Sequence, residues 1–208
     1  MKRTGSQIPI SPLEATAIVL AGGRSSRMGR EKATISLEGE LLIERIVRLL
    51  RPLFRDILVV LGQEHEERVK GVRYARDRIA HHGPLVGLEA GLSATRTDLN
   101  YVQACDMPFV NPHIVRRLAE LAEGYDAVVP ETENGLEPLH AFYRRSCLPA
   151  VEEALERGER RLSSFYPNIR VRTVSLSELR DLPGVDHAFL DLNTEGELEE
   201  IRALLEPQ

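Results

Sequence analysis

The 208-residue chain lacks tryptophan, contains only two cysteines, and has Phe, Trp and Tyr at 5% of its positions. Cys105 and Cys147 form no Cys-x-x-Cys motif, and the six histidines show no metal-ligand spacing, so neither a disulfide framework nor a zinc site is expected. No apolar run approaches the roughly 18 residues that a membrane span requires. Residues 1–13 have no secretion-signal pattern and are expected to form a flexible tail on a cytoplasmic protein.

Lysine is also scarce, because Lys2, Lys32 and Lys70 are the only three among 27 basic residues, against 32 acidic ones. The net charge of -5 argues against DNA or RNA as the main partner, since polyanions are bound by basic surfaces. The charge is unevenly divided: residues 1–105 hold 16 basic and 12 acidic side chains, whereas residues 106–208 hold 11 and 20. The N-terminal half therefore favours a small anionic ligand.

Short apolar runs alternate with segments of helical periodicity along the chain. Strands are predicted at residues 15–20, 56–61, 72–75, 101–104, 127–129, 139–143, 170–174 and 188–190, and helices at residues 41–50, 84–94, 111–123, 148–157 and 196–205. Most connections between strands are too long for hairpins, which predicts an α/β fold whose mostly parallel sheet carries helices on both faces. The lack of an internal repeat or a linker favours one domain over residues 1–208.

The most informative segment, residues 20–32, directly follows the first predicted strand and contains Gly22, Gly23 and Gly29. Ligands of parallel α/β sheets bind beyond the carboxyl ends of the strands, and glycines let backbone N–H groups approach a phosphate closely. Positive charge is supplied there by Arg24, Arg27, Arg30 and Lys32. The spacing matches neither a P-loop nor a dinucleotide fingerprint. We interpret the segment as a triphosphate cradle, with a solvated surface loop as the alternative.

This segment resembles the signature L-A-G-G-x-S-x-R-M-G-x-[DE]-K of nucleotidyltransferases of the molybdenum cofactor guanylyltransferase type. Three later segments are similar to further motifs of that family, in the same order: Gly83-Pro84-Leu85-Val86-Gly87, Cys105-Asp106-Met107-Pro108-Phe109 and Asn193-Thr194-x-x-Glu197-Leu198. The resemblance covers residues 15–205. It implies a Rossmann-like three-layer α/β/α sandwich with a mostly parallel, mixed central sheet, of the nucleotide-diphospho-sugar transferase type.

Asp106 is predicted to be both a metal ligand and a catalytic residue. It follows the predicted strand at 101–104 and should project at the same sheet edge as the glycine segment. A carboxylate there can hold Mg²⁺ against the phosphates of a nucleotide, as nucleotidyl transfer requires. The alternative is an Asx turn ahead of Asn111. The resemblance matches Asp106 to the family's magnesium aspartate.

Lys32 and Arg27 complete the predicted catalytic set. The scarcity of lysine indicates that a mobile point charge is required at position 32, with an ion pair to Glu31 as the alternative. The resemblance implies that this lysine contacts the nucleotide phosphates. The complete set of predicted nucleotide-binding residues is Leu20, Ala21, Gly22, Gly23, Arg24, Lys32, Asp77, Gly83 and Asp106.

Asp77 is the predicted reader of the base. Its carboxylate can accept from N1–H and the exocyclic amino group of guanine, a paired donor that adenine lacks. It aligns with a nucleotide-contacting aspartate of the family, whereas an ion pair with Arg76 or Arg78 is the alternative. The chain departs from the family after the second strand, where Leu61, followed by Gln63, occupies the place of a nucleotide-contacting asparagine.

Further segments are predicted around these residues. Gly83 begins a tight turn into a helix whose N-terminus can stabilise an anion. Residues 137–140 and 158–161 resemble the acceptor side of the family's cleft, with surface turns as the alternative, and Asp191 and Asn193 match polar residues near the active site. An acceptor role is a minor alternative to solvated charge for Arg116, Arg117, Arg144 and Arg145.

The resemblance implies an enzyme that transfers GMP from GTP to molybdopterin, forming molybdopterin guanine dinucleotide and pyrophosphate, with Mg²⁺ as cofactor. One alternative is another nucleotidyltransferase of the same fold, such as a cytidylyltransferase for the same cofactor. The other is a non-catalytic nucleotide-binding regulatory module. The expected partners are GTP and molybdopterin, with cofactor-insertion chaperones or molybdoenzymes receiving the product. A monomer or weak oligomer is expected, with neither nucleic acid nor membrane as a partner.

Overall fold

The computed structural model describes residues 11–22, 35–77 and 83–205. The strands are β1 (Leu13–Leu20), β2 (Ser36–Leu37), β3 (Glu40–Leu41), β4 (Phe54–Leu61), β5 (Arg73–Arg76), β6 (Leu99–Ala104), β7 (Ala127–Thr132), β8 (Gly135–Leu136), β9 (His140–Arg144) and β10 (Val171–Ser175). The helices are α1 (Leu42–Leu50), α2 (Pro84–Ala94), α3 (Pro112–Glu120), α4 (Leu148–Glu156), α5 (Leu176–Leu179) and α6 (Glu195–Leu205), with 3-10 segments η2 (Arg145–Cys147), η3 (Leu162–Asn168) and η4 (Val185–His187). None of the helices in these ranges is long and apolar enough to cross a membrane.

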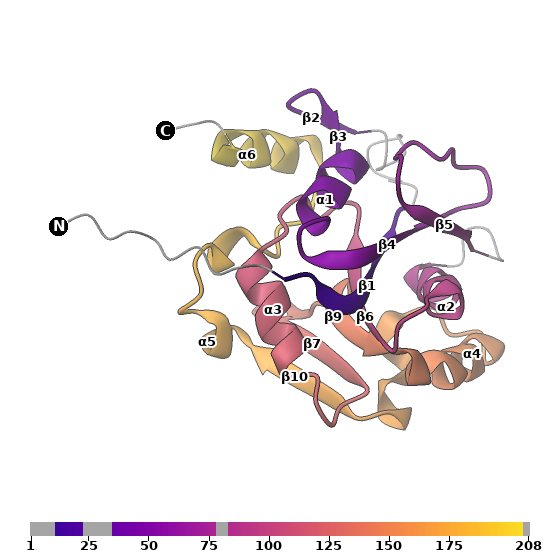
Figure 1. The fold of residues 1–208 in the computed structure, drawn as a ribbon. Coiled ribbons are helices and arrows are strands. Elements are labelled where there is room, and N and C mark those ends of the chain that lie inside the picture. The colour runs from indigo at the N-terminus through magenta and orange to yellow at the C-terminus, as the bar shows by residue number, and fades with distance from the viewer. Residues whose placement is uncertain (1–10, 23–34, 78–82, 206–208) are drawn as a thin grey trace.

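The strands build one mixed sheet in the order β10-β7-β9-β6-β1-β4-β5, with β8 paired to β7 (Figure 1). β1 is parallel to both of its neighbours, β4 and β6, and β5 continues the parallel set beyond β4. β9 runs antiparallel to β6 and β7. A separate hairpin joins β2 and β3. The predicted mostly parallel, mixed sheet is confirmed.

Apolar side chains cover both faces of the sheet, as β1 illustrates. Ala17 and Val19 belong to a core shared with α1, α3 and α5, whereas Ile18 belongs to a second core shared with α2, α4 and η3. Because side chains alternate along a strand, the continuous apolar run of β1 fills both cores. The three-layer arrangement follows, with helices on each side of the sheet (Figure 1).

Two predictions near the chain ends need correction. The predicted strand at residues 188–190 is wrong, because these residues form a turn after η4. Ala188 and Phe189 pack against the core without strand pairing, so their apolar character reflects burial only. The predicted tail at 1–13 is also too long at its C-terminal end, since Leu13 already belongs to β1. Residues 1–10 lie outside the described ranges.

A network of polar side chains joins neighbouring strands at the amino-terminal edge of the parallel set. The Thr97 hydroxyl donates to Thr16 Oγ1 at 2.8 Å, and Thr16 Oγ1 donates to Asp56 Oδ2 at 3.1 Å. Arg73 binds the same carboxylate with two nitrogens, one of them Nε at 3.1 Å from Oδ1. Buried Asn100 donates to the carbonyl of Tyr143, which extends the network to β9.

This network predicts an acid-sensitive contribution to stability. The hydrogen bonds from Arg73 lower the pKa of Asp56 below its ordinary value of 3.8. A carboxyl group whose pKa falls on folding stabilises the native state above the unfolded pKa, and this contribution disappears as the pH falls through the folded pKa. Asp56→Asn should therefore lower the free energy of unfolding by about 1–3 kcal/mol near neutral pH, and by less in acid. Urea denaturation across the acid range checks this, and a loss independent of pH would contradict it.

A second prediction concerns the contact between α2 and β1. A Cβ added at Gly91 would lie 2.7 Å from Ile18 Cγ2 and 3.2 Å from Ile18 Cδ1. Gly91→Ala should therefore force the helix away from the strand and lower the free energy of unfolding by about 1–3 kcal/mol. Gly196→Ala in α6 is the matched control, because its nearest neighbour, Thr194 Oγ1, is 4.0 Å away. Equal denaturation midpoints for the two variants would rule out a tight contact.

Candidate active site at the carboxyl edge of the parallel strands

The carboxyl ends of β1, β4, β5 and β6 meet at one edge of the sheet. Backbone hydrogen bonds continue beyond the strands, from Ala21 N to Val60 O at 2.9 Å and from Cys105 N to Leu20 O at 3.1 Å. A similar bond joins Asp77 N to Leu61 O at 3.0 Å. These bonds bring three predicted site segments to the same edge: Leu20-Ala21-Gly22, Asp77 and Asp106.

Gly22 is packed against the neighbouring backbone. A Cβ at this position would lie 2.9 Å from the amide nitrogen of Gly62 and 3.4 Å from Asp77 Oδ2. No side chain fits in that space, so the glycine allows the ends of β1, β4 and β5 to approach each other. The predicted cradle residues that follow, Gly23, Arg24, Arg27 and Lys32, lie outside the described residues.

Asp77 is half-buried beside this glycine contact. The neighbouring Arg76 directs its guanidinium to the loop after β4, where Nη1 donates to the carbonyls of Gly62 and His65 at 3.2 and 2.9 Å. Arg76 therefore holds the loop that borders Asp77. Arg78, the other partner considered for Asp77, lies outside the described residues.

Sequence reasoning missed Gly62 and His65. The residues predicted at the end of β4 were Leu61 and Gln63, but Leu61 is buried in the core and Gln63 is exposed. Gly62 makes the contact with Gly22, and the buried ring of His65 occupies the space where a Cβ of Gly62 would lie, 2.7 Å from that position. A glycine directly after a buried strand was the available signal, because the same pattern identified Gly22.

Gly83 lies against one of the two predicted acceptor segments. It has a φ of 86° and precedes Pro84, the first residue of α2. A Cβ at Gly83 would lie 3.3 Å from the carbonyl oxygen of Arg160. The predicted acceptor segment 158–161 therefore lies directly against this turn, and the side chains of Arg160 and Arg161 are exposed there.

Asp106 is half-buried just beyond β6, and its carbonyl accepts a hydrogen bond from Leu192 N at 2.8 Å. The helix cap that follows belongs to Asn111, whose Oδ1 accepts from the amides of His113 and Ile114 at 2.9 and 3.3 Å. Asp106 is therefore not needed to begin α3. Its contact with Leu192 brings the last predicted motif to the same edge.

That last motif is a capping box at the start of α6. Glu197 Oε2 accepts from the amides of Asn193 at 2.7 Å and Thr194 at 2.8 Å, while Glu197 N donates to Thr194 Oγ1 at 3.2 Å. Asn193 Nδ2 donates to Asp191 Oδ2 at 3.4 Å. The box therefore fixes the backbone that carries Asp191 and Asn193 beside Asp106.

The other predicted acceptor segment, residues 137–140, contains one half-buried carboxylate, Glu137, and one core residue, His140. Glu137 accepts from Thr132 Oγ1 at 2.9 Å, and burial, with a smaller contribution from Asp191, raises its pKa above the ordinary value. His140 is fully buried, so the surface-turn alternative is wrong for that residue.

Three of the four arginines considered as minor acceptor candidates bind other partners, and the fourth, Arg145, is exposed. Arg144 pairs with Asp98 and donates to the carbonyl of Tyr125, because antiparallel β9 ends at the opposite edge of the sheet. Arg117 pairs with Glu120. Arg116 donates to the carbonyl of Ser11, and Arg145 is exposed in η2.

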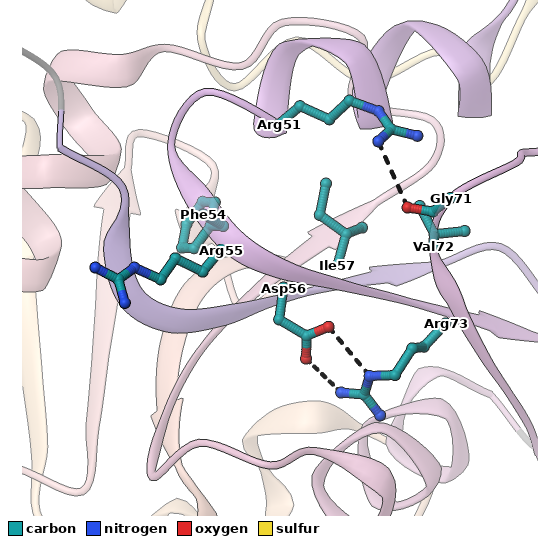
Figure 2. Close-up of a pocket in the computed structure, with 8 residues that line it drawn as sticks. All are labelled: Arg51, Phe54, Arg55, Asp56, Ile57, Gly71, Val72 and Arg73. Carbon is teal, nitrogen blue, oxygen red and sulfur yellow. Dashed lines mark hydrogen bonds and ion pairs between the residues drawn. The ribbon is translucent and has the colours of Figure 1, made fainter.

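A cavity of about 370 Å³ lies at that opposite edge, around the start of β4 (Figure 2). Its arginines are already bound: Arg73 to Asp56, Arg55 to Glu14, and Arg51 to the carbonyls of Lys70 and Gly71. Figure 2 shows that the guanidinium groups of Arg51, Arg55 and Arg73 diverge. The cavity therefore lies at the other edge of the sheet from Gly22, Asp77 and Asp106.

Comparison with known proteins identifies the family of the chain. Residues 17–171 match the family described as the MobA-like NTP transferase domain. The chain is 39% identical over 194 residues to a probable molybdenum cofactor guanylyltransferase from Pelotomaculum thermopropionicum, covering 93% of this chain and 95% of that protein. It is 33% identical over 192 residues to the molybdenum cofactor guanylyltransferase of Desulfosudis oleivorans, covering 91% and 95%.

Solved structures give the same picture. The molybdopterin-guanine dinucleotide biosynthesis protein A of Archaeoglobus fulgidus superposes with a TM-score of 0.77 at 27% identity, covering 91% of this chain and 97% of that one. A 2-C-methyl-D-erythritol 4-phosphate cytidylyltransferase from Thermus thermophilus shares the fold, with a TM-score of 0.69 at 17% identity and coverage of 91% and 98%. The chain belongs to the MobA-like NTP transferase family.

Proposed function

We propose that this enzyme transfers GMP from GTP to the terminal phosphate of molybdopterin, producing molybdopterin guanine dinucleotide and pyrophosphate. The observation that carries the proposal is the convergence of Gly22, Asp77 and Asp106 at one sheet edge. The relatives named as molybdenum cofactor guanylyltransferases, each matched over most of its length, support the choice of donor and acceptor.

In the proposed reaction, an oxygen of the acceptor phosphate attacks the α-phosphorus of GTP. A new P–O bond forms while the bond from the α-phosphorus to the bridging oxygen of the β-phosphate breaks, and pyrophosphate leaves with that electron pair. The chain then has to orient the two substrates and stabilise the charge that develops on the phosphates. No covalent intermediate with the enzyme is required.

The two halves of the chain have different tasks in this reaction. The backbone at Leu20-Ala21-Gly22, followed by the cationic segment that includes Arg27 and Lys32, binds the triphosphate. Arg160 and Arg161, exposed beside the Gly83 turn, are suited to the acceptor phosphate, because their segment contacts the nucleotide half directly. An acceptor phosphate bound at the contact between Arg160 and the Gly83 turn would lie next to the triphosphate, in position for attack.

Asp106 would hold Mg²⁺ in this site. Its carboxylate is half-buried on a backbone that Leu192 N binds, and carboxylate oxygen is the hard ligand that Mg²⁺ prefers. Asp191 and Asn193, on either side of Leu192 in the sequence, carry further oxygen atoms. When bound, the ion would neutralise charge on the α-phosphate and the leaving pyrophosphate.

The role of Asp106 predicts a loss of activity without a comparable loss of stability. Asp106→Asn should lower the rate of pyrophosphate release from GTP and molybdopterin by on the order of 100- to 1000-fold. Its thermal midpoint should stay close to that of the parent, since the carboxylate is half-buried and its backbone contact remains. Asp181→Asn, in the exposed turn after α5, is the matched control. Wild-type turnover by Asp106→Asn would refute the assignment.

Base selection by Asp77 gives a separate prediction. Asp77→Asn should reduce the preference for GTP over ITP by about 10- to 100-fold, because ITP lacks the exocyclic amino group that the carboxylate is proposed to accept from. Parallel kcat/KM measurements with GTP, ITP, CTP and ATP check this. An unchanged ratio of GTP to ITP would exclude Asp77 as the base reader, and efficient turnover of CTP by the parent enzyme would favour the cytidylyl alternative.

A further inference from the structure

His140 is a buried histidine whose environment is almost entirely apolar and aromatic. It has no exposed surface, and neither ring nitrogen has a hydrogen-bond partner within the described residues. Burial lowers its pKa to about 3, so the ring is neutral near physiological pH. Its ring contacts Tyr101 edge-on, with centroids 5.5 Å apart and planes at 87°, and Phe189, with centroids 4.9 Å apart and planes at 65°.

One chain of contacts runs from this ring to the residue after Asp106. Tyr101, in contact with His140, donates its hydroxyl hydrogen bond to Gln103 Oε1 at 2.5 Å. Gln103 is fully buried, and its Nε2 donates to the carbonyl of Met107 at 2.9 Å. The side chains of Tyr101 and Gln103 therefore fix the C-terminal side of the turn that carries Asp106.

A second chain of contacts reaches Asp106 from the other side. Phe189 packs against the ring of His140 and belongs to the same irregular segment as Leu192. Leu192 is fully buried, and its amide donates to the carbonyl of Asp106 at 2.8 Å. The backbone around Asp106 is thus held from both sides, and both chains of contacts meet at His140.

We propose that His140 and Gln103 are positioning residues for Asp106, and that they set the place of its carboxylate through Tyr101–Met107 on one side and Phe189–Leu192 on the other. This inference rests on the proposed role of Asp106 in binding Mg²⁺. The aromatic contacts of His140 fix the orientation of both neighbouring rings, which a flexible aliphatic side chain does not do. Displacements of about 1 Å are enough to reduce catalysis by on the order of 100-fold.

The test separates metal binding from folding. The affinity for GTP is measured by calorimetry with Mn²⁺ and with EDTA, and the ratio of the two Kd values reports the contribution of the metal. His140→Leu and Gln103→Leu should each reduce this ratio by about 10-fold, with the Kd in EDTA unchanged. His140→Phe should restore the ratio, because it keeps both ring contacts and removes no hydrogen bond in the described residues. The double variant should be no worse than either single one, because both act through one turn.

Phe165→Leu is the matched control for core damage. Phe165 is a fully buried aromatic residue in the core on the other face of the sheet. Its variant should lower the thermal midpoint as His140→Leu does, yet leave the Kd ratio unchanged. Gln103→Leu provides an independent test should His140→Leu fail to fold.

Three outcomes would overturn the inference. Unchanged Kd ratios in both His140→Leu and Gln103→Leu would show that these residues serve packing only. A loss in His140→Phe as large as in His140→Leu would refute the argument from ring contacts. An unchanged ratio in Asp106→Asn would remove the proposed metal role of Asp106, and the positioning argument with it. Failure of GTP to bind the parent enzyme would instead refute the proposed function itself.

Discussion

The register of the parallel strands is the constraint on which the site depends. Thr16 of β1 pairs with Asp56 of β4 and with Asn100 of β6, and its side chain enters the polar network at that edge. Four residues further along β1, the same register places Leu20 beside Val60 and Ala104. A slip of one residue would exchange the two faces of a strand and leave the network unpaired. The hydrogen bonds at one edge therefore determine which residues meet at the other.

Backbone contacts, more than side chains, join the parts of this site. Gly22 lies against the Gly62 amide, Gly83 lies against the Arg160 carbonyl, and Asp106 accepts from Leu192. Each contact connects segments that are far apart in the sequence. In the sequence, the cationic segment belongs to the N-terminal half, whereas Asp106 begins the acidic half. Asp106 meets the end of β1 through the hydrogen bond from Cys105 N to Leu20 O.

Most of the fold could be predicted because apolar runs and helical periodicity report burial directly. The predicted bounds of α2 match the structure, and Asn111 caps α3 as its side chain favours. The strand at 188–190 was wrong because the apolar Phe189 packs on His140 without strand pairing. Over only three residues, a buried turn and a buried strand show the same run of apolar side chains.

The parts of the site that were missed depend on neighbours in space. Nothing in the local sequence shows that Gly91 faces Ile18, or that the ring of His65 closes over Gly62. Similarly, the predicted strand at residues 139–143 contains His140, but the sequence does not show that its ring contacts Tyr101 and Phe189. Such contacts are set by the topology of the sheet, which a single sequence specifies only through all of its elements together.

The antiparallel direction of β9 determines where the chain between β7 and β9 can vary in length. β7 and β9 run antiparallel, so β7 ends and β9 starts at the carboxyl edge of the parallel strands, and the turn between β7 and β8 at residues 133–134 is exposed there. Extra residues in that turn would not alter the order or direction of any strand. The hairpin at this edge can therefore vary in length among proteins of this architecture while the parallel strands stay constant.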